Sequence, residues 1–347
     1  MAMYMDPELM TSAPVITEGN EEKYDPENAP VEVMGLGTPV FPAVHLTAII
    51  TCGISTFVSG AILLYMFRTM KTSFWKCTMG DRLVVYLSIC DLGFSISHGL
   101  DHVIIFGTDD NTPEPACSVI AWFVQEFTLG QSLVVNIAAV AAVIIIVRER
   151  RVSFGRYDWV LITWAFGFPA VLGVVIAGND LLGAIGAWCF MDMRKAAGQA
   201  LNTFYILAMI TVFVVNSVCY IIVFAKIRQV EKMMESFSTG DTEAKEQSKR
   251  SRRSAQNMAL LVLAFLFQWS LYVAYTSWSF FGNPSYKLLV ADVFICNLGG
   301  VFNGIAYTLM RKYNRKAEGG GKKGKKGKGE DSLATSVTNV SEPTDKN

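Results

Sequence analysis

The strongest constraint on this chain is a series of long apolar runs that contain no Asp, Glu, Lys or Arg. Five such runs cover residues 33–67, 127–147, 159–179, 196–225 and 254–286. The hydrocarbon core of a bilayer requires about 20 apolar residues per helix, and each charge buried there costs several kcal/mol. Only 17% of the 347 residues are charged, against roughly 25% in a soluble domain. The composition therefore disfavours a soluble enzyme and excludes a wholly disordered chain.

Two further segments have spanning length although they contain carboxylates. Residues 83–106 contain Asp91 and Asp101, and residues 288–310 contain Asp292. We expect the third span to begin near Cys117 and to include Glu126. The prediction is an all-α membrane protein, a bundle of seven transmembrane helices near residues 42–68, 82–106, 117–147, 158–178, 197–228, 255–281 and 287–310.

Lysine and arginine are distributed unevenly about these spans. Twenty-six of the 30 lie in the loops after spans one, three and five or in the tail after span seven. Short basic loops stay in the cytoplasm, so we expect the N-terminus outside, the C-terminus inside and a multi-pass plasma-membrane protein. The expected parts are an acidic disordered extracellular arm (1–40), the transmembrane domain (41–312) and a disordered basic cytoplasmic tail (313–347). The net charge of zero then reflects two compartments of opposite charge.

Cysteine positions become informative once this topology is assumed. Of the seven cysteines, Cys117 and Cys189 are the two on the expected outer, oxidising side. We therefore predict a disulfide that ties the second external loop to the outer end of span three. Two free thiols are the alternative.

Polar residues form a stripe on each of three spans. At about 100° per residue, Asp91, His98, Asp101 and His102 fall within one face of span two. Ionisable residues inside a membrane face the bundle interior or a water-filled cavity. Convergence of the three stripes predicts a polar cavity in the outer half of the bundle, and polar packing between helices is the alternative. The stripe of span three contains Gln125, Thr128, Ser132 and Asn136, with Glu126 beside it. The stripe of span seven contains Asp292, Cys296, Asn303 and Tyr307.

Two sets of side chains receive expected roles. The first is a ligand-binding set in the outer half: His98, Asp101, His102, Gln125, Glu126, Thr128, Gln268, Trp269 and Asp292. The second is a central polar switch made of Asp91, Asn136, Asn303 and Tyr307. We expect no resident cofactor, with a sodium ion near Asp91 as a candidate. His98 and His102 lie one turn apart, as metal ligands do, but a hydrogen-bonded network is the favoured interpretation and no metal site is assigned.

Local motifs extend this picture. Leu87-Ser88-Ile89-Cys90-Asp91-Leu92 resembles the helix-two motif of G-protein-coupled receptors. The segment from Gly300 to Tyr307, Gly-Val-Phe-Asn-Gly-Ile-Ala-Tyr, resembles the helix-seven signature of the cyclic-AMP-receptor-like (class E) group. Trp188-Cys189-Phe190 is similar to the Trp-Cys-aromatic loop of that group and of secretin-like receptors. Ala142 stands where rhodopsin-like receptors carry an arginine, and Gly304 replaces their helix-seven proline. The resemblance is thus closest to the class E group.

The resemblance implies a receptor, not an enzyme, that binds an extracellular ligand and activates a heterotrimeric G protein through its basic loops. The expected exterior charge near −9 favours a neutral or cationic ligand over cyclic AMP. The tail is expected to bind anionic lipids and, when phosphorylated, an arrestin-like protein. No nucleic-acid partner is expected. The G-protein-facing residues are Arg148, Arg150, Arg151, Arg250, Arg252 and Arg253, and the phosphorylation candidates are Ser332, Thr335, Ser336 and Thr338.

Two other functions are alternatives. A transporter or a cation or proton channel would use the intramembrane carboxylates Asp91, Glu126 and Asp292. A retinal photoreceptor needs a lysine deep in the last helix, whereas Lys287 is expected at its outer edge. No nucleophile–base or metal triad in the sequence supports an intramembrane enzyme.

Overall fold

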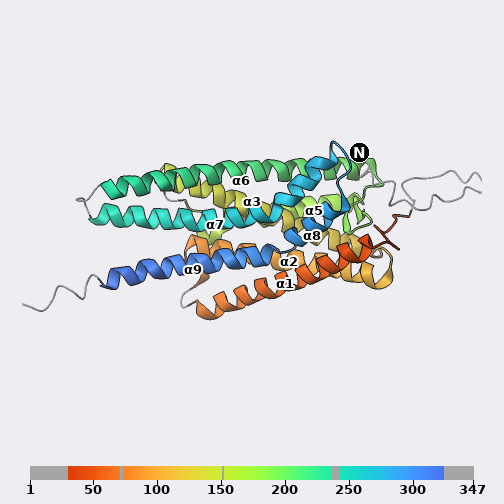
Figure 1. Ribbon diagram of the computed structural model, residues 1–347, viewed down its shortest axis with the longest axis horizontal. Helices are drawn as coiled ribbons and strands as arrows, with labels where there is room; N and C mark the ends of the chain where they lie inside the picture. The colour runs from red at the N-terminus through yellow and green to blue at the C-terminus, as the bar shows by residue number, and fades with distance from the viewer. Residues whose placement is uncertain (1–29, 71–72, 151, 237–241, 324–347) are drawn as a thin grey trace, which may run out of the picture. The chain divides into compact units, whose positions relative to one another are not determined.

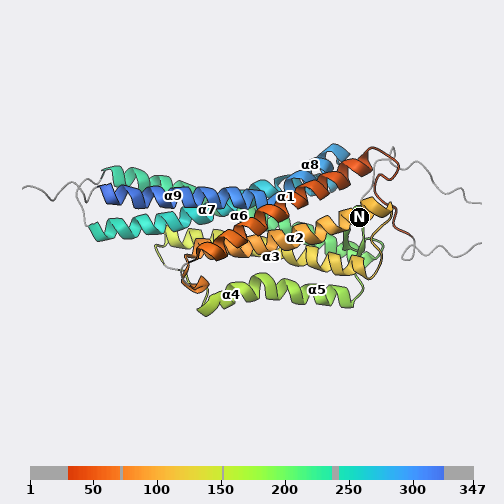
Figure 2. The same ribbon diagram turned by 90° about the horizontal axis from the view of Figure 1, so that it is seen from below.

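The computed structural model describes residues 30–70, 73–150, 152–236 and 242–323. It divides into two compact units, Met1–Thr308 and Leu309–Asn347. Within the first unit the helices run side by side (Figures 1 and 2). Helix α3 lies at the centre, in contact with α2, α5, α6 and α7, while α1 closes the bundle against α2 and α8. The helices and strands are α1 (Val40–Thr69), α2 (Met79–Thr108), α3 (Ala116–Val147), α4 (Trp159–Ile162), α5 (Phe168–Gly178), β1 (Leu182–Ala184), β2 (Cys189–Met191), α6 (Ala196–Ser236), α7 (Thr242–Ser279), α8 (Tyr286–Cys296) and α9 (Gly299–Lys323), with short turns η2 (Phe74–Lys76), η3 (Arg156–Asp158) and η4 (Thr163–Gly167).

Six segments of the described chain, or seven when one bent helix pair is counted as a span, are long and apolar enough to cross a membrane, which confirms the predicted fold. Six are single helical stretches, and the seventh is the pair α8 and α9, bent by 45°. The fourth stretch joins α4 and α5 through the π-helical turn η4. This wide turn precedes Pro169, which has no backbone N–H to donate to the preceding turn.

Sequence accounts for several helix boundaries. Thr78 caps α2 by accepting a hydrogen bond of 3.2 Å from the backbone N–H of Asp81, and Ser285 caps α8 through the N–H of Leu288. Helices α6 and α7 extend beyond the predicted span boundaries at residues 228 and 255, into residues 229–253. This segment is rich in Lys, Glu, Gln, Met and Arg, which favour helix.

The break between α8 and α9 places glycine against the bundle core. The backbone N–H of Gly300 donates to Oγ of Ser55 on α1 at 2.9 Å. A Cβ atom added to Gly299 would lie 2.6 Å from Oδ1 of Asp91. Only a residue without a side chain allows α9 to approach α1 and α2 this closely.

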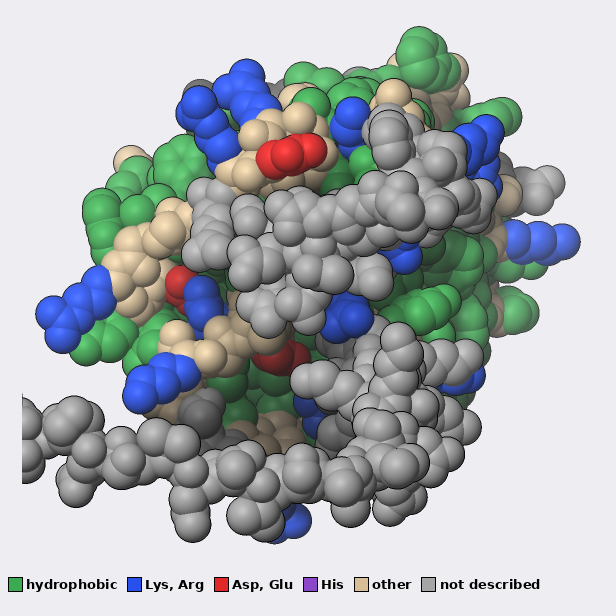
Figure 3. Space-filling model, turned by 90° about the vertical axis from the view of Figure 1, so that its left-hand side faces the viewer, with side chains coloured by type: hydrophobic (Ala, Val, Ile, Leu, Met, Phe, Trp, Pro, Cys, Tyr) green, Lys and Arg blue, Asp and Glu red, His purple; other side chains and the backbone are tan. Residues whose placement is uncertain are grey.

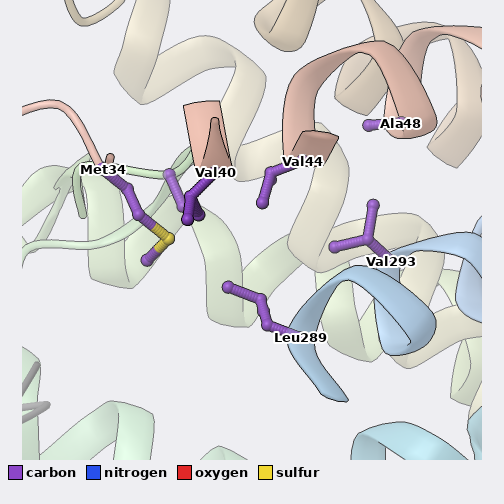
Figure 4. Close-up of a cluster of buried hydrophobic side chains, with 7 residues drawn as sticks. Met34, Val40, Val44, Ala48, Leu289 and Val293 are labelled. Carbon is purple, nitrogen blue, oxygen red and sulfur yellow. The ribbon is translucent and has the colours of Figure 1, made fainter. Parts of the chain in front are cut away.

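The segment before α1 is packed against the bundle at residues that we assigned to the extracellular arm. The N–H of Met34 donates to the carbonyl of Gly186 at 2.9 Å. Met34 also packs with Val40 and Val44 of α1 and with Leu289 and Val293 of α8 (Figure 4). Burial of this apolar surface orders residues 30–39. The rest of the arm, residues 1–29, lies outside the described residues.

The C-terminal segment also differs from the expected boundary at residue 313. Helix α9 continues to Lys323. The phosphorylation candidates Ser332, Thr335, Ser336 and Thr338 lie outside the described residues.

Candidate functional site

A partly open cavity of about 100 Å³ lies among α2, α3, α6, α7 and α8, beneath the β1–β2 hairpin. We call the end of the bundle that carries this hairpin the hairpin end. Most of the lining is apolar or aromatic, which is typical of small-molecule sites. The lining residues are Phe94, His98, Val124, Thr128, Ile185, Trp188, Phe190, Asn202, Tyr205, Ile206, Trp269, Tyr272, Tyr275, Thr276, Asp292, Val293, Cys296 and Asn297.

The hairpin forms the roof of this cavity. Its strands pair antiparallel from Leu182 opposite Met191 to Ala184 opposite Cys189, and Gly186 turns the chain with a φ of +89°. The predicted disulfide between Cys117 and Cys189 is present and attaches the hairpin to the first turn of α3. Trp188 and Phe190, on either side of that cysteine, line the cavity.

Asp101 fixes the roof from below. Its Oδ2 accepts the backbone N–H of Cys189 at 2.6 Å, and its Oδ1 accepts the hydroxyl of Thr112 at 2.6 Å. Asp101 is fully buried and does not line the cavity. The structure therefore places this ligand-binding candidate where it holds the hairpin.

The three histidines of the chain form one hydrogen-bonded row. Nδ1 of His45 on α1 lies 2.8 Å from Nδ1 of His102, and Nε2 of His102 lies 3.2 Å from Nε2 of His98. Of the three, His98 alone lines the cavity. Its Nδ1 is buried and has no hydrogen-bond partner in the described structure. No group of three or more His, Cys, Asp or Glu side chains suited to a metal ion occurs in the described residues.

Asp292 is the acidic residue of the cavity. It lies on α8 and is 5% exposed, and its Oδ1 accepts a hydrogen bond from the thiol of Cys296 at 2.9 Å. Among the described residues, no ion pair joins Asp292 to Lys, Arg or His. The cavity thus contains one carboxyl group without a cationic partner from the described chain.

Trp269 connects the cavity to a polar network deeper in the bundle. Its ring lines the cavity, and its indole N–H donates to Oε1 of Gln131 at 3.2 Å. The amide of Gln131 donates in turn to Asp91 Oδ1 at 2.7 Å. The amide of Asn303 donates to Asp91 Oδ2, also at 2.7 Å. We call Gln131, Asp91, Asn303 and Gln268 the central network.

Gln268 belongs to this network and does not line the cavity. Its Oε1 accepts from Gln131 at 3.0 Å, and its Nε2 donates to the carbonyl of Cys296 at 2.9 Å, beside the α8–α9 break. The network therefore joins α2, α3, α7, α8 and α9. Two other switch candidates have different described contacts: Asn136 donates to Asn216 on α6 at 3.1 Å, and the ring of Tyr307 packs against Tyr65 of α1.

The nine ligand-binding candidates thus separate into two groups. His98, Thr128, Trp269 and Asp292 line the cavity, whereas Asp101, His102, Gln125, Glu126 and Gln268 do not. Gln125 and Glu126 are buried elsewhere on α3, with side-chain atoms that have no hydrogen-bond partner in the described structure.

Sequence reasoning did not assign several lining residues to the site. Trp188 and Phe190 belong to the loop motif, and Tyr272 and Tyr275 lie within the predicted sixth span. Tyr205 carried no polar or periodic signal. An aromatic ring in a membrane span is equally suited to packing, to the interface and to a cavity, so position along the chain does not separate these roles.

Basic residues at the hairpin end form ion pairs with acidic residues. Arg194 donates to both oxygens of Asp192 at 2.9 Å, and Lys195 pairs with Asp180. Burial by itself raises the pKa of Asp192. Hydrogen bonds from Arg194 and the charges of Arg194 and Lys195 outweigh that effect and hold the pKa below its ordinary value of 3.8. Asp192 is therefore ionised at neutral pH.

The basic end of the bundle, where α1 ends at Thr69 and α2 begins at Met79, has a different character. Lys and Arg side chains surround its face (Figure 3), and the exposed ones include Arg68, Lys76, Arg148, Arg150, Arg156 and Arg228. Arg252 and Arg253 are half-buried, Arg151 lies outside the described residues, and nothing is described of the Arg250 side chain.

An ion pair that the sequence did not predict lies at this basic end. Arg82 donates to Asp158 through Nε at 2.6 Å and through Nη2 at 3.0 Å. The hydroxyl of Tyr86 adds a bond of 3.1 Å. Asp158 is buried and has a positive φ of 54°, a conformation that Asp tolerates better than most residues.

Comparison with solved structures decides the fold. The crystal structure of squid rhodopsin superposes with a TM-score of 0.62 at 18% identity, over 80% of this chain and 84% of that chain. The fold is the seven-helix fold of a rhodopsin. No protein-family model and no curated protein sequence matches the chain. Lys287, on which a photoreceptor interpretation depended, is exposed on the first turn of α8 and does not line the cavity.

Proposed function

We propose that this multi-pass membrane protein is a G-protein-coupled receptor that binds an extracellular ligand in the cavity beneath the hairpin and activates a heterotrimeric G protein. The observation that carries this proposal is the position of Trp269. A ligand in the cavity contacts the ring whose N–H is bonded to Gln131, and Gln131 is bonded to Asp91. Ligand contact and the central network therefore share one side chain.

Activation by a ligand requires that the ligand bind one arrangement of the helices more tightly than another. A ligand shifts an equilibrium only by as much as it prefers one state. The central network joins five helices through buried hydrogen bonds, and a displacement of Trp269 changes the partner of Gln131. Asp91 and Asn303 are the proposed core of this switch, as the sequence suggested.

The hairpin end is the proposed extracellular side. The distribution of basic residues supports this orientation, and so does the disulfide at the hairpin, because disulfides persist in oxidising compartments. We propose a plasma-membrane location. The basic end then meets the G protein, with Arg148 and Arg150 exposed for that contact.

Further parts of the proposal rest on sequence. The lysine-rich tail is proposed to bind anionic lipids, and its phosphorylated form an arrestin-like protein. The Gly300–Tyr307 motif supports placement near the cyclic-AMP-receptor-like group.

Sodium is proposed near Asp91, because the hydroxyls of Ser88 and Ser95, on the same face of α2, are buried without described partners and are oxygen donors of the kind that this ion takes.

Nucleotide exchange tests the function. We would place the full chain in lipid nanodiscs with purified G proteins and measure guanine-nucleotide exchange during a screen of neutral and cationic small molecules. A ligand should accelerate exchange about tenfold or more. The double variant R148E/R150E should remove this acceleration, whereas Lys287→Glu, a charge reversal at the hairpin end, should preserve it.

A transporter or channel that uses Asp91, Glu126 and Asp292 is less well supported. Asp292 lines the cavity, Asp91 belongs to the central network and Glu126 to neither, and no described hydrogen bond joins one of these carboxyl groups to another. Ion or substrate flux in vesicles, lost on neutralising these carboxylates and unaccompanied by nucleotide exchange, would favour the transporter and contradict the receptor.

A further inference from the structure

We propose that the cavity selects a small protonated amine, with Asp292 as its counter-ion and the rings of Trp188, Tyr272 and Tyr275 around its cationic group. This inference deepens the proposed function and rests on it for the extracellular origin of the ligand. The recognition chemistry itself stands on the contents of the cavity.

Asp292 provides the electrostatic argument. A carboxylate taken out of water loses several kcal/mol of solvation unless a positive charge or several hydrogen-bond donors replace the water. The described partner of Asp292 is a single thiol, that of Cys296. A bound ammonium group supplies both the charge and strong N–H donors, so the site is complementary to a cation.

Aromatic rings provide a second and independent argument. A cation within about 6 Å of a ring centroid is attracted by the negative face of the ring, most strongly when water is excluded. Tyr272 and Tyr275 line the cavity one turn apart on α7, and Trp188 faces it from the hairpin. Tyr275 also packs against the side chains around Val293, the residue next to Asp292. The carboxyl group and the three rings therefore line the same cavity.

His98 supplies a directional polar group beside Trp188, with the centroids of the two rings 5.6 Å apart. It is 6% exposed, and its Nδ1 has no described partner while Nε2 is bonded to His102. With the proton on Nε2, Nδ1 accepts a hydrogen bond from a ligand N–H or O–H. A small amine with a second polar group can thus bind both Asp292 and His98.

Anionic ligands have no matching partner. The cavity lining contains no Lys or Arg, and Arg194 and Lys195 at the hairpin end are held by Asp192 and Asp180. A phosphate or carboxylate in the cavity would meet Asp292 without a compensating cation. The cavity is partly open, and its volume of about 100 Å³ suits a small molecule.

Three probes of matched size test the charge preference. Phenethylamine, 2-phenylethanol and phenylacetate would be added to the purified full-length protein, and thermal unfolding would be followed. Phenethylamine should raise Tm in a saturable manner, as a ligand of the folded state does, and the alcohol and the acid should not. Tetramethylammonium should also raise Tm, because its binding needs the charge and the rings but no N–H donor. An equal effect of the alcohol, or no effect of either cation, would overturn the proposal.

Variants then locate the interaction. Asp292→Asn should weaken phenethylamine at least ~10-fold, as expected for loss of a partly buried charge pair. Asp109→Asn makes the same chemical change at an exposed carboxylate near the hairpin end and should have no effect. Unchanged affinity in Asp292→Asn would contradict the counter-ion role.

Cys296 offers a measurement that does not depend on the stability of a charge variant. It lines the cavity beside Asp292. In a background without the free cysteines Cys52, Cys77, Cys90 and Cys219, an ethylammonium methanethiosulfonate should label Cys296 at least ~10-fold faster than the ethylsulfonate reagent. Equal rates would count against a cation-selective cavity.

The two proposals fail in different ways. Cation binding that is lost in Asp292→Asn, without any nucleotide exchange, would support the ligand class and contradict the receptor function. Nucleotide exchange driven by a neutral ligand and unaffected by Asp292→Asn would support the receptor and contradict the amine.

Discussion

The side-chain amide of Asn303 donates a 2.7 Å hydrogen bond to the carboxyl group of Asp91, across 212 residues of sequence. Both side chains are at least 97% buried. The other carboxyl oxygen of Asp91 is occupied by Gln131, so this group accepts from α3 and from α9 at once. The two residues that the sequence suggested as a switch are therefore in direct contact.

Exchange of the two partners should reveal their coupling. Asp91→Asn places two amide groups against one another, and Asn303→Asp places two carboxyl groups against one another. Each single variant should lower the free energy of unfolding by about 1–3 kcal/mol. The double variant restores a donor and an acceptor, so it should recover at least half of the loss. Thermal unfolding of the four proteins measures this coupling. Strictly additive losses would show that the contact is not coupled.

The bond between Trp269 and Gln131 predicts a separation of binding from signalling. Trp269→Phe retains an aromatic ring in the cavity but removes the N–H, at a cost of about 1 kcal/mol. Ligand affinity should change less than threefold, about 0.7 kcal/mol, whereas ligand-stimulated nucleotide exchange should change several-fold. Trp278→Phe, at a ring on the same helix that is 61% exposed, is the matched control. Parallel changes in affinity and exchange would argue against a transmitting role.

The approach of α9 to the bundle core predicts an intolerant glycine. Gly299→Ala places a methyl group 2.6 Å from Asp91 Oδ1, so it should destabilise the fold by roughly 1–3 kcal/mol or more. Gly107→Ala is the comparison, since a Cβ there meets nothing within 4 Å. Removal of that helical glycine should stabilise by about 0.5–1 kcal/mol. Cell-surface expression and Tm measure both effects. Normal Tm in Gly299→Ala would contradict the close contact.

The pairing of Asp192 with Arg194 predicts how the hairpin end responds to acid. A carboxyl group whose pKa is lowered in the folded state stabilises the protein above its unfolded pKa, about 3.9, and this stabilisation is lost as the pH falls through the folded value. The Tm of Asp192→Asn should therefore be lower than that of wild type at pH 7. The Tm difference between the two proteins should become smaller below about pH 4. Asp180→Asn, at an exposed carboxyl, should show a smaller effect. A Tm difference between variant and wild type that is the same at pH 7 and pH 3 would refute the stabilisation of the Asp192 carboxylate by Arg194.

Sequence alone was sufficient for the seven spans, the basic distribution and the disulfide. Each depends on one-dimensional information: the thickness of the bilayer sets the length of an apolar run, and the sides alternate with every span. Once the sides are assigned, Cys117 and Cys189 remain as the outer pair. The contact of Asp91 with Asn303 was also within reach, because both stood in the middle of polar stripes.

Tertiary structure alone decided which polar residues reach the cavity. Asp101 and His98 lie on one face of α2, less than one turn apart, yet Asp101 bonds to the hairpin and His98 lines the cavity. Helical periodicity gives the face of a side chain but not the depth, tilt or neighbour that it meets. The hairpin roof adds Trp188 and Phe190 from outside the spans, and their position depends on Asp101, on the disulfide and on the packing of Met34 against α8. These are contacts between distant segments, and they exist only when the bundle is assembled.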